Sequence, residues 1–203
     1  MRPRHLLGAA AAATLAAALW WRKNPSACPY GQRFWVEAPH PFITRDRLRE
    51  VLRPQPGERL LEVGVGTGYY SCELAEWVTP GGALELFDLQ QEFLDHVMRA
   101  AAERNLNNLV PTQGDATNLP YEDASIDAVV LTAVLGEIPD REAALSEIHR
   151  VLKPTGRLIV GELFGDPHFT SRKSLEKLGA EAGFELAELS GPRLGYFARL
   201  SPN

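Results

Sequence analysis

Residues 60–71 read LLEVGVGTGYYS, and this stretch decides the fold: an apolar strand carrying Glu62 runs directly into glycines at 64, 66 and 68. Glycine at a strand-to-helix turn permits positive φ and lets a ligand approach the main chain closely. A helix that follows such a turn directs its free N–H groups and the positive end of its dipole at that ligand. The stretch therefore predicts a nucleotide-type ligand at the turn.

The spacing of the glycines argues against a dinucleotide. The G-x-G-x-x-G fingerprint needs a third glycine where this chain has Tyr69. The carboxylate of Glu62 would repel phosphates, whereas it could pair with an ammonium group or accept ribose hydroxyls. A nicotinamide-dependent oxidoreductase is therefore disfavoured.

Two acids further along the chain extend the pattern. Asp88 follows a second predicted strand, at about the distance expected of an acid that binds ribose hydroxyls. Asp115 lies in the turn Gly114-Asp115-Ala116, ahead of another apolar strand. Each acid alone could instead cap a helix or its own turn. Together with the glycine turn they favour a ligand that spans several strand ends.

These motifs resemble those of class I methyltransferases that use S-adenosylmethionine. The resemblance rests on E-x-G-x-G-x-G at 62–68, on Asp88 and Asp115, and on LPYEDASID at 119–127. It continues through AALSEIHRVLKPTGRLIVGE at 143–162, which is similar to the family's fifth helix, K-P-x-G turn and fifth strand, and it covers roughly residues 39–200. Within the superfamily, the ubiquinone- and menaquinone-type small-molecule methyltransferases are the most similar in pattern.

The resemblance implies a Rossmann-like α/β fold and a set of cofactor contacts. The fold would be a seven-stranded, mostly parallel sheet with helices on both faces and an antiparallel last strand, so that ligands lie at the carboxyl ends of the strands. Besides strand one, the patterns place helices over 44–51, 69–77, 91–104, 141–152 and 171–182, and strands over 83–87, 109–112, 126–131, 158–162, 184–189 and 196–200. The residues expected to bind S-adenosylmethionine are Glu62, Gly64, Gly66, Gly68, Asp88, Leu89, Asp115, Ala116 and Thr132.

The sequence defines the binding site of the methyl acceptor less sharply. If the acceptor is a phenol or thiol, a group must take its proton, and the candidates are His40, Glu137 and His168. Segments 39–51 and 163–170 would roof the acceptor pocket, with Phe42, Phe164 and Tyr196 as substrate contacts. Such aromatic residues favour a small apolar acceptor: a quinone, phenol, thiol or lipid. A non-catalytic cofactor-binding or scaffolding module of the same fold is the alternative.

Composition excludes other classes. The chain has 203 residues, 45% of them hydrophobic, and a formal net charge of −5 without a long basic run, which argues against nucleic acid. The cysteines, Cys28 and Cys72, form no metal-ligand pattern, so no metal is expected.

The first 23 residues are expected to be separate from a linker at 24–41 and a methyltransferase domain at 42–203. Residues 6–21 (LLGAAAAATLAAALWW) are uncharged and end at Arg22-Lys23. As a helix they would span about 24 Å, short of the ~30 Å hydrocarbon core, but paired tryptophans beside cations are typical of a membrane interface. A membrane anchor with a cytoplasmic catalytic domain is favoured; a signal peptide or an alanine-rich helix of a soluble cytoplasmic protein are the alternatives.

Overall fold

The computed structural model describes residues 24–35 and 40–203. Its elements, in chain order, are η1 (Tyr30–Trp35), α2 (Arg45–Leu52), β1 (Arg59–Val63), α3 (Ser71–Trp77), β2 (Ala83–Asp88), α4 (Gln91–Glu103), β3 (Leu109–Gln113), β4 (Ile126–Thr132), α5 (Arg141–Val151), β5 (Leu152–Leu163), α6 (Arg172–Glu181), β6 (Phe184–Ser190) and β7 (Gly195–Pro202). The predicted N-terminal apolar helix lies outside the described residues. Within them, no helix is long and apolar enough to cross a membrane.

The strands form one seven-stranded sheet in the order β3-β2-β1-β4-β5-β7-β6. The first five strands in this order run parallel, and β7 is antiparallel to both β5 and β6. This arrangement confirms the predicted mostly parallel sheet with an antiparallel last strand. The chain order reverses direction between β1 and β4, which is where parallel α/β sheets bind ligands.

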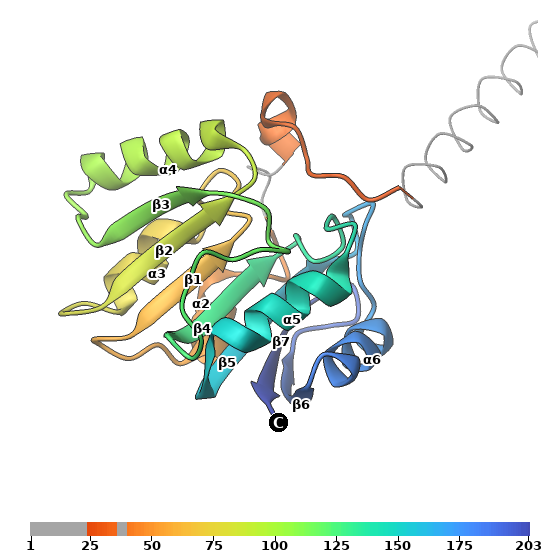
Figure 1. The fold of residues 1–203 in the computed structure, drawn as a ribbon. Coiled ribbons are helices and arrows are strands. Elements are labelled where there is room, and N and C mark those ends of the chain that lie inside the picture. The colour runs from red at the N-terminus through yellow and green to blue at the C-terminus, as the bar shows by residue number, and fades with distance from the viewer. Residues whose placement is uncertain (1–23, 36–39) are drawn as a thin grey trace, which may run out of the picture.

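Helices cover both faces of the sheet, and each face has its own apolar core. Side chains of α5 and α6 pack on the face that is nearer the viewer in Figure 1. Those of α2, α3 and α4 pack on the other face, with Leu60, Val130 and Ile159 of the central strands. Strands buried on both faces read as continuous apolar runs, as β4 does (IDAVVLT).

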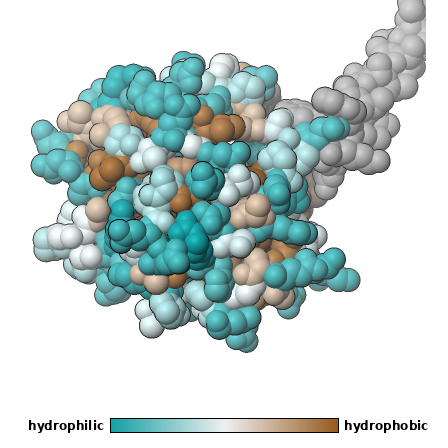
Figure 2. Space-filling model, in the orientation of Figure 1, coloured by the Kyte–Doolittle hydropathy of each residue, from teal (hydrophilic) through white to brown (hydrophobic). Residues whose placement is uncertain are grey.

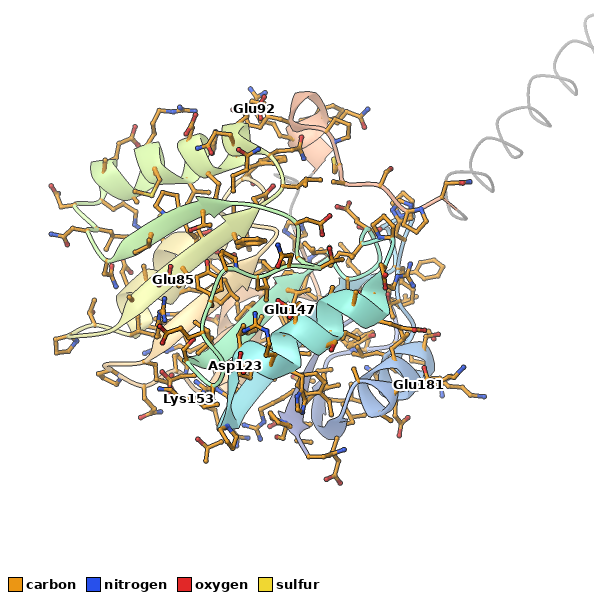
Figure 3. All side chains as sticks on the ribbon, in the orientation of Figure 1. Glu85, Glu92, Asp123, Glu147, Lys153 and Glu181 are labelled. Atoms are coloured by element: carbon orange, nitrogen blue, oxygen red, sulfur yellow. The ribbon has the colours of Figure 1, made fainter. Side chains whose placement is uncertain are left out.

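Polar side chains attach the connections to this frame. Thr44 caps α2 as predicted, because its side chain accepts a hydrogen bond from the Arg47 N–H. On the near face, Arg150 of α5 pairs with Glu147 and Asp123, which Figure 3 shows close together. The same guanidinium donates to the carbonyls of Leu119 and Tyr121, so it fixes the loop before β4. Figure 2 shows that this side of the molecule is largely hydrophilic.

β5 differs most from its predicted length. β5 begins at Leu152, where the sequence predicted its start at 158. Leu152 pairs with Ile126, and a register shift separates this pair from that of Ala128 with Arg157. The K-P-T-G stretch between them is thus an irregular extension of the strand.

Candidate active site

A cavity of about 950 Å³ lies at the carboxyl ends of the parallel strands. Its walls come from the loops that follow β1 to β5, which are adjacent in the sheet although far apart in the chain. Residues 24–35, which we call the N-terminal strap, cross these strand ends (orange in Figure 1) and contribute Pro25, Ser26, Ala27, Cys28 and Gln32 to the lining.

Most residues expected to bind the cofactor meet in this cavity. Its lining includes Glu62, Gly64, Gly66, Asp88, Leu89, Asp115, Ala116 and Thr132. Gly68 is not among the lining residues. A Cβ on Gly68 would lie 2.8 Å from Cγ2 of Val97, so this glycine permits close packing of the loop on α4.

The order of the strands sets the order of polar groups along the cavity. Asp115 follows β3, Asp88 ends β2, and the glycine loop follows β1. Glu137 and Asp166 come from the loops after β4 and β5. Neighbouring strands lie about 4.8 Å apart, so these groups form a row across the sheet edge.

The glycine loop needs glycine for both conformation and space. Gly64 has a φ of +73°, and a Cβ there would lie 2.3 Å from Cγ2 of Val134, on the loop after β4. Gly66 has a φ of +50°, and its N–H donates to Oδ2 of Asp88 at 3.4 Å. The first two glycines therefore let three loops converge on the cavity.

Glu62 supports this loop from β1, the strand that precedes it. It is buried, and its Oε2 accepts a hydrogen bond of 2.5 Å from the hydroxyl of Ser71, at the start of α3. Burial, with smaller contributions from Asp88 and Glu73, raises the pKa of Glu62 to about 8 although the Ser71 bond opposes the shift. Glu62 thus links β1 to the helix that follows the loop.

Asp88 and Asp115, the two acids expected to bind the cofactor, lie in different environments. Asp88 is 7% exposed, its Oδ1 accepts from the Gln90 N–H at 2.9 Å, and burial raises its pKa. Asp115 is exposed, and its Oδ1 accepts from the N–H and the hydroxyl of Thr117, both at 2.9 Å. Asp115 therefore does stabilise its own turn, and it lines the cavity as well.

The polar side chains that line the cavity suit a cationic ligand that carries hydroxyl and amino groups. Among the described lining residues there are five carboxyl side chains and no arginine or lysine. The hydroxyl oxygen of Thr132 is buried and makes no hydrogen bond within the described part of the chain, so it is available to a ligand. The described residues contain no group of His, Cys, Asp or Glu arranged to hold a metal ion.

Sequence reasoning missed the residue that holds the strap. The side-chain amide of Gln90 donates to the Cys28 carbonyl at 2.9 Å and accepts from the Tyr30 N–H at 3.0 Å. Tyr30 also packs edge-on against Phe93 of α4, with ring centroids 5.1 Å apart. Gln90 directly follows the predicted Asp88-Leu89 pair, but a contact to a residue 60 positions away leaves no local signal.

All three candidates for the proton acceptor line the cavity: His40, Glu137 and His168. The ring of His40 packs against that of Tyr69, and burial lowers the pKa of His40. His168 is buried, and its main-chain N–H donates to Asp166 at 2.6 Å. Glu137 accepts a hydrogen bond from the Cys28 N–H at 3.3 Å. The cavity therefore brings the candidates together without choosing among them.

The three aromatic residues expected to contact substrate are not part of the described cavity lining. Tyr196 is fully buried in the core, where its hydroxyl donates to the Thr170 carbonyl. Phe42 packs at Gly195, and Phe164 is 60% exposed. The predicted roof segments do contribute, through His40, Ile43, Leu163 and Gly165 to His168. Aromatic character on these segments therefore reflects core packing and surface exposure.

Comparison with known proteins now assigns the fold to a family. Residues 61–160 match the family model described as a methyltransferase domain. These residues form a class I methyltransferase domain. A demethylmenaquinone methyltransferase of Lactobacillus johnsonii is 34% identical over 164 residues, which are 77% of this chain and 64% of that relative. The chain thus spans less than two thirds of the length of this relative. The predicted family resemblance is confirmed.

Solved structures agree on the fold of this methyltransferase domain. An S-adenosylmethionine-dependent methyltransferase from Aquifex aeolicus superposes with a TM-score of 0.78 at 18% identity, covering 87% of this chain and all of that one. The [4+2]-cyclase SpnF superposes with a TM-score of 0.65 at 28% identity, covering 74% of this chain and 60% of that chain. The domain's fold is therefore shared by proteins with differently named activities.

Proposed function

We propose that this methyltransferase domain transfers a methyl group from S-adenosylmethionine to a small, apolar acceptor. The observation that carries the proposal is the row formed by Asp115, Asp88 and the glycine loop along one cavity, in the order of the strands. Relatives named as demethylmenaquinone methyltransferases favour an acceptor of quinone type.

In this proposal each residue of the row binds one part of the cofactor. Asp88 accepts hydrogen bonds from the ribose hydroxyls, and Asp115 accepts one from the adenine amino group beside Ala116. Main-chain carbonyls at 64–68 hold the ammonium group, and Glu62 supports them through its bond to Ser71. Bound S-adenosylmethionine supplies a methyl group on a positively charged sulfur, which the carboxyl-rich lining stabilises.

The strap contributes to the proposed reaction by covering the cavity. Methyl transfer by direct displacement requires alignment of the reacting atoms and exclusion of water. The strap is hydrogen-bonded to Gln90 after β2 and to Glu137 after β4, on opposite sides of the glycine loop. In the proposal it shields the site while Gln90 and Glu137 hold it in place.

The activity is tested by incubating purified protein with S-adenosylmethionine and a demethylmenaquinol, a thiol or a lipid extract. We expect S-adenosylhomocysteine and a methylated product in equal amounts, detected by mass spectrometry. Protein that fails to bind S-adenosylhomocysteine would remove the proposal.

A second candidate function follows from the similarity to SpnF, which is named as a cyclase. In this alternative the chain binds the cofactor, or acts on another ligand, without transferring a methyl group. Saturable binding of S-adenosylhomocysteine, together with no methylated product from any of these acceptors, would favour the alternative.

We also propose that residues 6–21 attach the protein to a membrane, with the catalytic domain in the cytoplasm. The uncharged run and its paired tryptophans support this, and an apolar acceptor would be concentrated there. Fractionation of cells expressing the full chain, or a chain beginning at residue 24, tests it. We expect only the full chain in the membrane fraction. Full-length protein in the soluble fraction would remove the anchor, and shortened protein outside the cytoplasm would favour a signal peptide.

A further inference from the structure

One end of the cavity is left over once the proposed cofactor contacts are assigned. It is formed by the loops after β4 and β5 and contains two carboxyl groups, Glu137 and Asp166. The lining at this end also includes His168 and several apolar residues: Val134, Ile138, Pro139, Leu163 and Pro167. No arginine or lysine is among the described lining residues. This end therefore presents acids to an acceptor in mainly apolar surroundings.

Glu137 is held in a fixed place on this wall. The turn that carries it is closed by a hydrogen bond of 2.9 Å from the Glu137 N–H to the Val134 carbonyl. Arg141 donates to the Gly136 carbonyl at 2.8 Å, and a Cβ on Gly136 would lie 1.8 Å from the His168 carbonyl oxygen. The two loops thus pack closely at Gly136. The carboxylate itself accepts from the Cys28 N–H of the strap.

The position of Val134 connects Glu137 to the reacting end of the proposed cofactor site. Val134 fills the space beside Gly64, where a Cβ would meet it at 2.3 Å. Glu137 lies three residues beyond Val134, on the side of the glycine loop opposite Asp88 in the sheet order. A substrate next to Glu137 therefore adjoins the part of the cavity assigned to the methionine portion of the cofactor.

The charges at this end select the acceptor's chemistry. Besides His168, whose charge acts on Asp166, this end has two carboxyl groups and no arginine or lysine in its described lining, so its ionised carboxylates repel a carboxylate, a phosphate or a thiolate. A neutral hydroxyl group instead gains a charge-assisted hydrogen bond to a carboxylate, whereas a thiol is a weak donor. We propose that Glu137 binds the hydroxyl of a neutral phenol or hydroquinone and accepts its proton during methyl transfer. This proposal rests on the proposed function.

The proton and electron balance of the step is simple. As the acceptor atom bonds to the methyl carbon, the carbon–sulfur bond breaks and its electron pair stays on sulfur, which becomes neutral. The hydroxyl proton moves to a carboxylate oxygen of Glu137. Burial and the charge of Asp166 raise the pKa of Glu137 to about 8, with a smaller contribution from Asp88 and an opposing one from the Cys28 bond. A base of that strength is better matched to a phenol, whose pKa is about 10, than an ordinary carboxylate.

Binding of a matched set of naphthalenes tests the charge selection. Protein saturated with S-adenosylhomocysteine is titrated at pH 8.5 with 1-naphthol and 1-naphthoate. We expect 1-naphthol to bind at least tenfold more tightly than 1-naphthoate. Equal or tighter binding of 1-naphthoate, or binding of neither probe, overturns the proposal. Failure to bind S-adenosylhomocysteine at all would instead overturn the proposed function.

The Glu137→Gln substitution tests the residue, with Glu142→Gln on the exposed surface of α5 as the matched control. We expect E137Q to bind 1-naphthoate at least fivefold more tightly, because a negative charge is removed. Methylation of 1-naphthol in a single turnover should fall at least a hundredfold, while affinity for S-adenosylhomocysteine stays within twofold. E142Q should match the parent in all three measurements. Unchanged naphthoate affinity or an unchanged methylation rate in E137Q contradicts the role of Glu137.

Discussion

Gln90 holds Cys28 across the mouth of the cavity: its side-chain amide donates to the Cys28 carbonyl at 2.9 Å. The same amide accepts from the Tyr30 N–H at 3.0 Å, so one side chain binds two points of the strap. Glu137 anchors Cys28 from the other side. The loops after β2 and β4 are in this way joined above the glycine loop by a segment from the start of the chain.

Because the strap covers the cavity, we predict that S-adenosylhomocysteine, the product formed from the cofactor, dissociates slowly. Replacing Gln90 by alanine removes two hydrogen bonds, each contributing about 0.5–1.5 kcal/mol. We expect S-adenosylhomocysteine to dissociate roughly five- to a hundredfold faster from Q90A in stopped-flow measurements. Gln91, whose side chain donates to the exposed Asp95, provides the control Q91A. Equal dissociation rates for Q90A and the parent would show that the strap does not retain the ligand.

Substitution of Asp88, at the end of β2, tests the proposed contact with the ribose hydroxyls. Its carboxylate holds the N–H groups of Gly66 and Gln90 and faces the cavity. Loss of a charged acceptor for a pair of hydroxyls costs on the order of 1.5–3 kcal/mol, so we expect D88A to bind S-adenosylmethionine about ten- to a hundredfold more weakly. The exposed Asp95 gives the control D95A. Undiminished affinity of D88A in calorimetry would refute the ribose assignment.

The buried carboxyl groups predict that stability decreases as the pH rises. Burial raises the pKa of Glu62 to about 8 from an unfolded value of 4.5, with Asp88 and Glu73 adding to the shift and Ser71 opposing it. The folded state therefore binds more protons than the unfolded state between these values. The contribution of Glu62 is fully present below pH 4.5 and is lost as the pH rises through 8.

Thermal unfolding from pH 5 to 9 measures this dependence. Glu62→Gln keeps an acceptor for Ser71 but does not titrate, so its melting temperature should fall less steeply than that of the parent. Each pKa unit corresponds to about 1.4 kcal/mol, and each kcal/mol to ~2–4 °C in a chain of this size, so the curves should separate by several degrees. Burial also raises the pKa values of Glu137 and Glu162 to about 8, so the melting temperature of E62Q should still fall as the pH rises. Parallel curves for E62Q and the parent would be the contrary result.

Local patterns in the sequence were sufficient to predict the frame of the molecule. Apolar runs and caps predicted α2, β2 and β4 to within two residues, because burial on both faces and a threonine cap leave clear local signals. Sheet order places Asp88 and Asp115 in one cavity. Both acids could be predicted as site residues from the sequence because each lies at a strand end.

The remainder depends on contacts between distant residues. The pairing of Leu152 with Ile126 lengthens β5 beyond the range that its apolar run indicated. Tyr196 is buried because β7 lies between β5 and β6, a position that no feature of its own segment reveals. The strap follows from hydrogen bonds that connect residues 28 and 30 to residue 90. Gly68 has the spacing of a ligand-binding glycine, but its neighbour is Val97.

The central claim is that this cavity is the S-adenosylmethionine site, and calorimetric titration of a matched glycine pair tests it most directly. Gly66 lines the cavity with a φ of +50°, whereas Gly57 has a φ of +86° in the turn before β1, with no atom within 4 Å of an added Cβ. Valine strains the main chain at either position, so G57V controls for strain. We expect the parent and G57V to bind S-adenosylmethionine at one site with similar affinity, and G66V to bind at least a hundredfold more weakly. Undiminished affinity in folded G66V, judged by its melting curve, would contradict the account.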